Sequence, residues 1–177
     1  MKIYHYALMV HHIHIIIQSP DGKSLSGAMK RLNVSYTRYY RKRYKGIGHF
    51  FQDRFKSFLI QEGRYLLECG RYVELNPVRA GIVKSPDEYK WSSYRRYAEG
   101  EKNGIIDINP EYEGLSENSA LRRERYKEYI KDGVVEKRKE DRFFRDGVYG
   151  SKEFMEKMKE QGLKLVWSHG GKPKKKE

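Results

Sequence analysis

The sequence predicts an α+β domain, in which helices pack on an antiparallel sheet, followed by a small helical region. Residues Ile3 to Gln18 have the pattern of one or two strands broken near Val10, with a turn signal at Ser19 to Gly22. From Ser24 onward, apolar residues recur at three- and four-residue spacing, which indicates a helix. The same spacing from Glu62 to Asn76 predicts a second helix.

The predicted strands contain two histidines separated by one isoleucine, His12-Ile13-His14. Side chains alternate between the faces of a strand, so His12 and His14 project together while Ile13 turns away. Two imidazoles on one face can hold one metal ion. The alternative is a strand with two polar residues on its solvent face. We expect Ile13, Ile15 and Ile17 to form the opposite face, buried against helices.

The helix predicted from Ser24 is basic and rich in tyrosine. Its apolar positions are Leu25, Met29, Leu32 and Tyr36, and its cations on other faces are Arg31, Arg38, Arg41, Lys42 and Arg43. A nucleic-acid backbone along this helix and a merely solvated basic face are the two alternatives. Next, His49 to Ile60 alternates as a half-buried strand would, with Arg54 and Lys56 sharing a face. These two cations suit phosphate contacts, and salt-bridged strand cations are the alternative.

The second helix is expected to end at Asn76, because Pro77 disfavours helical geometry at the residue before it. Tyr72 and Asn76 would then lie one turn apart on the same face. The aromatic and basic segment Trp91 to Tyr97 either packs on the core or extends a binding surface. We predict a first domain over residues 1–100, a helical appendage over 101–170 with charged helices at Leu115 to Lys131 and Lys152 to Gln161, and a disordered basic tail over 171–177.

The composition indicates a polyanionic partner. The formal net charge is +13, from 37 Lys and Arg against 24 Asp and Glu, and the chain has 15 tyrosines. Tyrosines among cations suit stacked bases, although half-buried tyrosines are the alternative for any single one. A single cysteine, Cys69, excludes a disulfide framework and a Cys-rich zinc site. Without a secretory signal or an apolar run near the roughly 18 residues of a membrane span, we expect a soluble cytoplasmic protein.

The sequence lacks the motifs that are typical of several other classes of enzyme. The sequence has no Walker phosphate loop, no HExxH helix and no Gly-x-Ser-x-Gly elbow. Nucleotide hydrolysis, zinc proteolysis and serine esterase chemistry therefore lose support.

Four ordered blocks within residues 4–97 resemble a known family. They are His12 to His14, Gly48 to Ser57, Arg71 to Gly81 and Trp91 to Tyr94. Together they resemble the single-tyrosine HUH transposases, and within these the branch of REP-associated tyrosine transposases or insertion-sequence-type transposase proteins. The resemblance implies an HUH endonuclease-like fold with a ferredoxin-like or RRM-like core. It also implies metal-dependent cleavage and strand transfer of single-stranded DNA through a 5′-phosphotyrosine.

The resemblance implies roles for particular residues. His12 and His14 match the pair that binds a divalent metal, and Tyr72 matches the nucleophile, with Tyr65 as the next candidate. Asn76 matches the polar residue that completes the metal site, and a role at the helix end is its alternative. Such a mixed nitrogen and oxygen site suits Mn²⁺ or Mg²⁺, while zinc remains an alternative.

The implied partner is single-stranded DNA with a nearby hairpin, in a nucleoid-associated cytoplasmic setting, with a monomer and a homodimer both open. The candidates for DNA-backbone contacts are Arg38, Arg41, Lys42, Arg54 and Lys56. The blocks depart from the family in two ways: family members usually begin with an additional strand and helix, and usually have Asn where this chain has His11. We interpret His11 as a structural or outer-sphere residue. A catalytically inactive protein that binds hairpin nucleic acid is therefore the alternative function, and an RNA-binding or ribonuclease role is a third.

Overall fold

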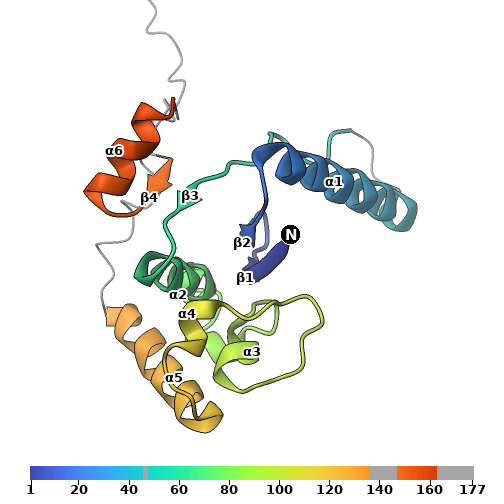
Figure 1. Cartoon of the computed structure of the whole chain (residues 1–177). Coiled ribbons are helices and arrows are strands. Elements are labelled where there is room, and N and C mark those ends of the chain that lie inside the picture. Colours follow the sequence, from blue (N-terminus) through green and yellow to red (C-terminus); the bar gives the residue numbers. More distant parts are fainter. Residues whose placement is uncertain (46–47, 136–146, 163–177) are drawn as a thin grey trace, which may run out of the picture. The chain divides into compact units, whose positions relative to one another are not determined.

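The computed structural model describes residues 1–45, 48–135 and 147–162 and has the predicted α+β fold (Figure 1). Its elements are β1 (Lys2–Leu8), β2 (Ile13–Gln18), α1 (Gly22–Tyr44), β3 (Leu59–Ile60), α2 (Arg64–Arg79), the 3-10 helix η1 (Pro86–Glu88), α3 (Tyr94–Ala98), α4 (Pro110–Glu113), α5 (Ser119–Val135), β4 (Val148–Tyr149) and α6 (Lys152–Glu160). The chain forms two compact units. The first comprises Met1–Lys2 and Ile17–Ser57, and the second comprises Ile3–Ile16 and the described residues from Phe58 onward.

The β1–β2 hairpin of the second unit confirms the predicted break between two strands. Its turn is closed by a hydrogen bond from the Met9 N–H to the His12 carbonyl, at 2.9 Å. Strand β1 also bonds to a segment outside the hairpin. The Leu8 N–H donates to the Trp91 carbonyl and the Ser93 N–H donates to the Tyr6 carbonyl, both at 2.9 Å. These bonds anchor the hairpin to a segment more than eighty residues later.

The buried face of β2 differs from the prediction. Ile13 is 49% exposed, whereas Ile16 is 5% exposed and packs in a cluster with Leu66 and Val73 of α2. The expectation that Ile13, Ile15 and Ile17 form the buried face is therefore wrong. Because side chains two residues apart share a face, His14 lies on the same side of β2 as Ile16, the side that packs on α2.

The first unit contains α1, which confirms the predicted helix. Asp21 caps its first turn by accepting a hydrogen bond from the Ser24 N–H, and Lys45 ends it with a left-handed φ of 52°. The rings of Phe50 and Phe51 lie 5.2 and 6.4 Å from that of Tyr36.

This packing shows why the strand predicted over residues 49–60 is wrong for most of its length. Adjacent residues of a strand point to opposite faces. Phe50 and Phe51 instead contact the same tyrosine, so this segment folds back on α1 rather than extending. Only Leu59–Ile60 is a strand, β3, which pairs in parallel with β4 in the register Leu59 to Val148 and Ile60 to Tyr149.

A core rich in tyrosine fills the second unit. Leu75, Tyr97 and Tyr126 are 0% exposed and belong to one cluster, together with Ile130 of α5. Helix α2 contacts α4 and α5, and α3 contacts α5 (Figure 1). Of the segment 91–97, Ser93, Tyr94 and Tyr97 are buried, so this segment packs on the core, although Trp91 is exposed.

The predicted domain boundary near residue 100 stays a prediction, and residues from both sides of that position share this core. Helix α6 confirms the helix predicted at Lys152 to Gln161, and α5 begins and ends four residues later than the predicted helix. The predicted tail, 171–177, lies outside the described residues. No helix within the described ranges is long and apolar enough to span a membrane.

Helix α2 does not end at Asn76 as predicted but continues through Pro77 to Arg79. A proline in a helix lacks the N–H that would bond to the carbonyl four residues earlier. Here that carbonyl belongs to Val73, and the Asn76 side-chain amide donates to it at 3.4 Å and to the Tyr72 carbonyl at 2.8 Å. The asparagine amide thus supplies the donor that Pro77 cannot.

Leu75→Ala should reduce the free energy of unfolding by about 2–5 kcal/mol, because the leucine is fully buried and the alanine leaves a cavity. Leu121 of α5 is 41% exposed, so Leu121→Ala is a matched control with an expected loss below about 1 kcal/mol. Urea unfolding followed by circular dichroism measures both. Equal losses would contradict the placement of Leu75 in the core.

Candidate active site

The two histidines converge. Their Nε2 atoms lie 3.0 Å apart, and the rings stand edge to face with centroids at 4.7 Å. Two nitrogen ligands held about 2.1 Å from one ion, at right angles, are separated by about 3 Å. His12, which is exposed, and His14, which is half-buried, therefore have the spacing of two ligands of one metal ion.

The electrostatics of His14 favour metal binding. Burial, and secondarily the neighbouring His12, lower the pKa of His14 to about 4. Its imidazole is therefore neutral at physiological pH, the form that has a lone pair for a metal. Burial also raises the pKa of the Cys69 thiol to about 12, so this cysteine is not a thiolate ligand.

Helix α2 brings Tyr72 against the histidine pair. The rings of Tyr72 and His14 are perpendicular, with centroids 5.9 Å apart. The structure thus places together two of the residues that the sequence predicted for one site.

Asn76 lies one turn beyond Tyr72 on α2, as predicted, and is half-buried. Its amide nitrogen is directed to the helix backbone, so its Oδ1 is the atom left for a metal ligand. Within residues 1–45, 48–135 and 147–162, no three His, Cys, Asp or Glu side chains form a group that could hold a metal. The residues that the structure brings together are therefore His12, His14 and Tyr72, and Asn76 stays a predicted ligand.

Arg79 contacts Tyr72, and the sequence prediction did not include it among the candidate site residues. Its guanidinium carbon lies 5.0 Å from the centre of the Tyr72 ring, and its NH1 donates to the Tyr72 carbonyl at 3.5 Å. Seven residues separate Tyr72 from Arg79, two helical turns, so helical spacing indicates that they share a face. The sequence prediction ended this helix at Asn76, so it did not place Arg79 on the same helix as Tyr72.

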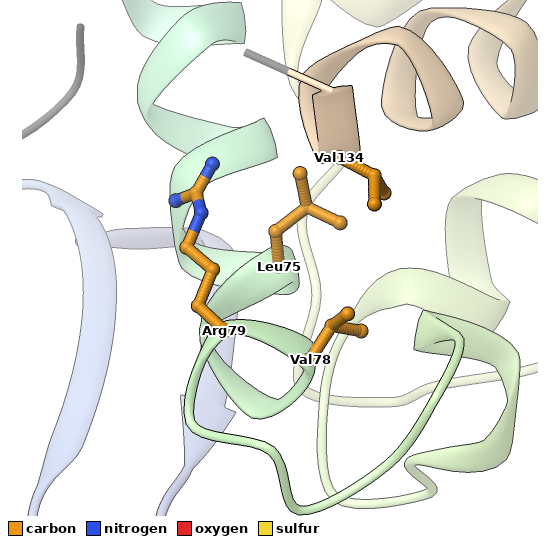
Figure 2. A pocket seen from close by; sticks show the side chains of 4 residues that line it. All are labelled: Leu75, Val78, Arg79 and Val134. Carbon is orange, nitrogen blue, oxygen red and sulfur yellow. The ribbon is translucent and has the colours of Figure 1, made fainter. Parts of the chain in front are cut away.

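A small cavity lies between α2 and α5. It has a volume of about 90 Å³ and is lined by Leu75, Val78, Arg79 and Val134 (Figure 2). Sites for small molecules usually occupy about 300–1,000 Å³. This cavity is therefore a packing defect between α2 and α5 rather than a nucleotide site.

The five cations predicted to contact DNA belong to the first unit and are exposed: Arg38, Arg41 and Lys42 on α1, and Arg54 and Lys56 in the segment after it. Arg41 also donates to the Gly48 carbonyl. The histidine pair, Tyr72 and Asn76 all belong to the second unit.

A hairpin that bears two convergent imidazoles thus packs on a helix that presents a tyrosine to them. Residues 1–76 match the family described as "Transposase IS200 like". This similarity supports the family expected from the sequence, and the matched range includes His12, His14, Tyr72 and Asn76. Comparison with curated proteins and with solved structures gave no match.

The lowered pKa of His14 predicts a loss of stability in acid. The unfolded chain takes up a proton at His14 near pH 6.5, whereas the folded chain does so only near pH 4. The unfolded state therefore binds more protons between these values, and the free energy of unfolding should fall as the pH drops through this range.

Urea unfolding at about pH 7 and about pH 4.5, with EDTA present, should show a smaller loss for His14→Gln than for the wild type. Identical losses would place His14 in a more solvated environment than the structure shows.

Proposed function

We propose that this chain is a metal-dependent transposase that cuts and rejoins single-stranded DNA near hairpins through a 5′-phosphotyrosine on Tyr72. The observation that carries the proposal is the perpendicular contact between the Tyr72 and His14 rings, at 5.9 Å. This contact joins a candidate nucleophile to a candidate metal ligand, and both residues lie within the family match.

The candidate ligands suit Mg²⁺ or Mn²⁺. His12 and His14 would contribute Nε2 atoms and Asn76 its Oδ1, a mixed set that favours Mn²⁺ over the more oxygen-seeking Mg²⁺. When bound, such an ion supplies a Lewis acid that neutralises charge on a scissile phosphate. His14 offers a neutral imidazole for this purpose over the physiological pH range.

The reaction is a transesterification. The Tyr72 hydroxyl attacks the phosphorus, its proton passes to solvent or a base, and a bond from the tyrosine oxygen to phosphorus forms. The bond from phosphorus to the 3′ oxygen breaks, and that oxygen takes up a proton as a free 3′ hydroxyl. The Arg79 guanidinium lies over the Tyr72 ring, where its permanent positive charge favours the approach of a phosphate.

The phosphotyrosine keeps the energy of the broken ester, so attack by another 3′ hydroxyl rejoins strands without ATP. This agrees with the lack of a Walker phosphate loop in the sequence. The net charge of +13 supports a nucleic-acid substrate. Arg38, Arg41, Lys42, Arg54 and Lys56 are proposed to contact its phosphates, which would make binding weaken with salt.

Tyr72→Phe should abolish covalent attachment to an end-labelled hairpin DNA in the presence of Mn²⁺, by on the order of 10³-fold or more, because it removes the attacking oxygen. Binding of the same DNA should change little. A denaturing gel detects the labelled protein, and a gel shift measures binding.

Tyr65→Phe is the matched control for this experiment, since Tyr65 lies two turns earlier on α2. It should retain the labelled band. A band that persists in Tyr72→Phe and disappears in Tyr65→Phe would show that Tyr65, not Tyr72, is the nucleophile. Tight binding without any band from the wild type would support the inactive hairpin-binding protein instead.

His14→Ala should weaken Mn²⁺ binding at least tenfold. Removal even of a residue that only supports a ligand costs about 10–100-fold in metal affinity. Isothermal titration calorimetry on EDTA-treated protein measures the change. His49→Ala is the control, because His49 is exposed and belongs to the first unit, and it should titrate like the wild type. Equal affinities for His14→Ala and the wild type would remove His14 from the metal site.

A further inference from the structure

A second group of polar side chains lies on α2, fully buried and distinct from the candidate metal site. At its centre is the Glu74 carboxylate, which is 0% exposed. One oxygen accepts hydrogen bonds from His5 Nδ1 at 2.9 Å and from the Ser93 hydroxyl at 2.6 Å. The other accepts from the Tyr126 hydroxyl at 2.7 Å. Strand β1, the residue preceding α3, and α5 therefore all bond to one carboxylate on α2.

The hydrogen bonds indicate which nitrogen of a neutral His5 ring carries the proton. Asn109 Oδ1 accepts from the Glu111 N–H at 2.9 Å, which directs its Nδ2 toward His5 Nε2 at 3.0 Å. An amide nitrogen can only donate, so Nε2 accepts and the proton of the neutral ring is on Nδ1. That proton is the one given to Glu74. Burial raises the pKa of Tyr126 well above its usual value, so its hydroxyl also remains a donor.

Gly70 of α2 allows β1 and α2 to approach each other closely. A Cβ placed on Gly70 would lie 2.6 Å from His5 Nε2, so only glycine allows the imidazole to sit this close to the helix. The ring of His5 also stacks on Tyr97, with centroids 4.5 Å apart. The imidazole is thus held between α2 and the core.

Glu74 and the candidate nucleophile Tyr72 lie two residues apart on the same helix, α2. Residues two apart on a helix are about 200° apart around its axis. Tyr72 accordingly faces His14 of β2, and Glu74 is bonded to His5 of β1, the strand paired with β2. From α2, the candidate nucleophile thus contacts one strand of the hairpin and the buried carboxylate bonds to the other strand.

We propose that Glu74 is the positioning residue of this enzyme: its bonds to His5, Ser93 and Tyr126 fix the rotation of α2 so that Tyr72 stays against the histidine pair. The inference rests on the proposed function. A rotated or shifted α2 would leave the buried carboxylate without donors, which is costly. Small displacements matter because a shift of about 1 Å at a reacting group can slow a reaction by about 100-fold.

Two tyrosine variants provide a matched test. Tyr126 and Tyr112 are both buried in the same core, but the Tyr126 hydroxyl donates to Glu74 whereas the Tyr112 hydroxyl donates to the Tyr97 carbonyl. Each Tyr→Phe change removes one buried hydroxyl. We expect Tyr126→Phe to slow single-turnover adduct formation at saturating hairpin DNA by about 10–100-fold, with DNA and Mn²⁺ affinities within about twofold of the wild type. Tyr112→Phe should keep the rate within about threefold.

A purely structural role predicts equal effects of the two variants on rate, and that result would overturn the proposal. Loss of DNA or Mn²⁺ affinity in parallel with the rate would also overturn it. The second measurement needs neither metal nor DNA: the nuclear Overhauser effect between the Tyr72 and His14 rings, which should weaken in Tyr126→Phe and persist in Tyr112→Phe.

The two measurements separate the hypotheses. If the wild type forms no adduct, the proposed function fails, and the ring contact alone decides whether Glu74 positions α2. If the wild type forms the adduct and the variants behave alike in both measurements, only the positioning role fails.

Discussion

A carboxylate without access to water must obtain all its hydrogen bonds from the protein, and Glu74 imposes this constraint on the second unit. Its donors come from β1, from the residue before α3 and from α5, so another arrangement of these elements around α2 would leave the carboxylate without some of its donors. The apolar packing of Leu75 against α5 is compatible with several rotations of a helix, whereas directed hydrogen bonds are not. Placement of Tyr72 follows from the same constraint.

Local features of this fold were predictable, and features set by distant contacts were not. The extents of α1 and α6 and the common face of His12 and His14 follow from spacing within short segments. The buried face of β2 depends on which side α2 packs against, a contact between residues fifty apart in sequence. Pro77 is tolerated inside α2 because the Asn76 amide donates in its place, a compensation that helix rules based on proline alone do not include.

The family match ends at Asn76, but the support of the candidate site extends beyond it. Ser93 and Tyr126 bond to Glu74, and Asn109 bonds to His5, and all three residues follow the matched region. Residues 1–76 therefore contain the candidate ligands, the candidate nucleophile and Glu74, whereas three side chains that complete this hydrogen-bond network lie outside the match. Sequence blocks indicated the family, whereas the role of Glu74 was not predicted because its partners lie far away along the chain.

The most direct test of the central claim, that Tyr72 is the nucleophile of a DNA transesterase, is to locate the covalent bond. Protein incubated with hairpin DNA and Mn²⁺ would be treated with nuclease and trypsin and examined by mass spectrometry. Tyr65 and Tyr72 fall in different tryptic peptides, because Arg71 separates them. We expect a nucleotide phosphate on the peptide Tyr72–Arg79. Its attachment to the peptide Tyr65–Arg71, or its absence from both peptides despite tight DNA binding, would contradict the assignment.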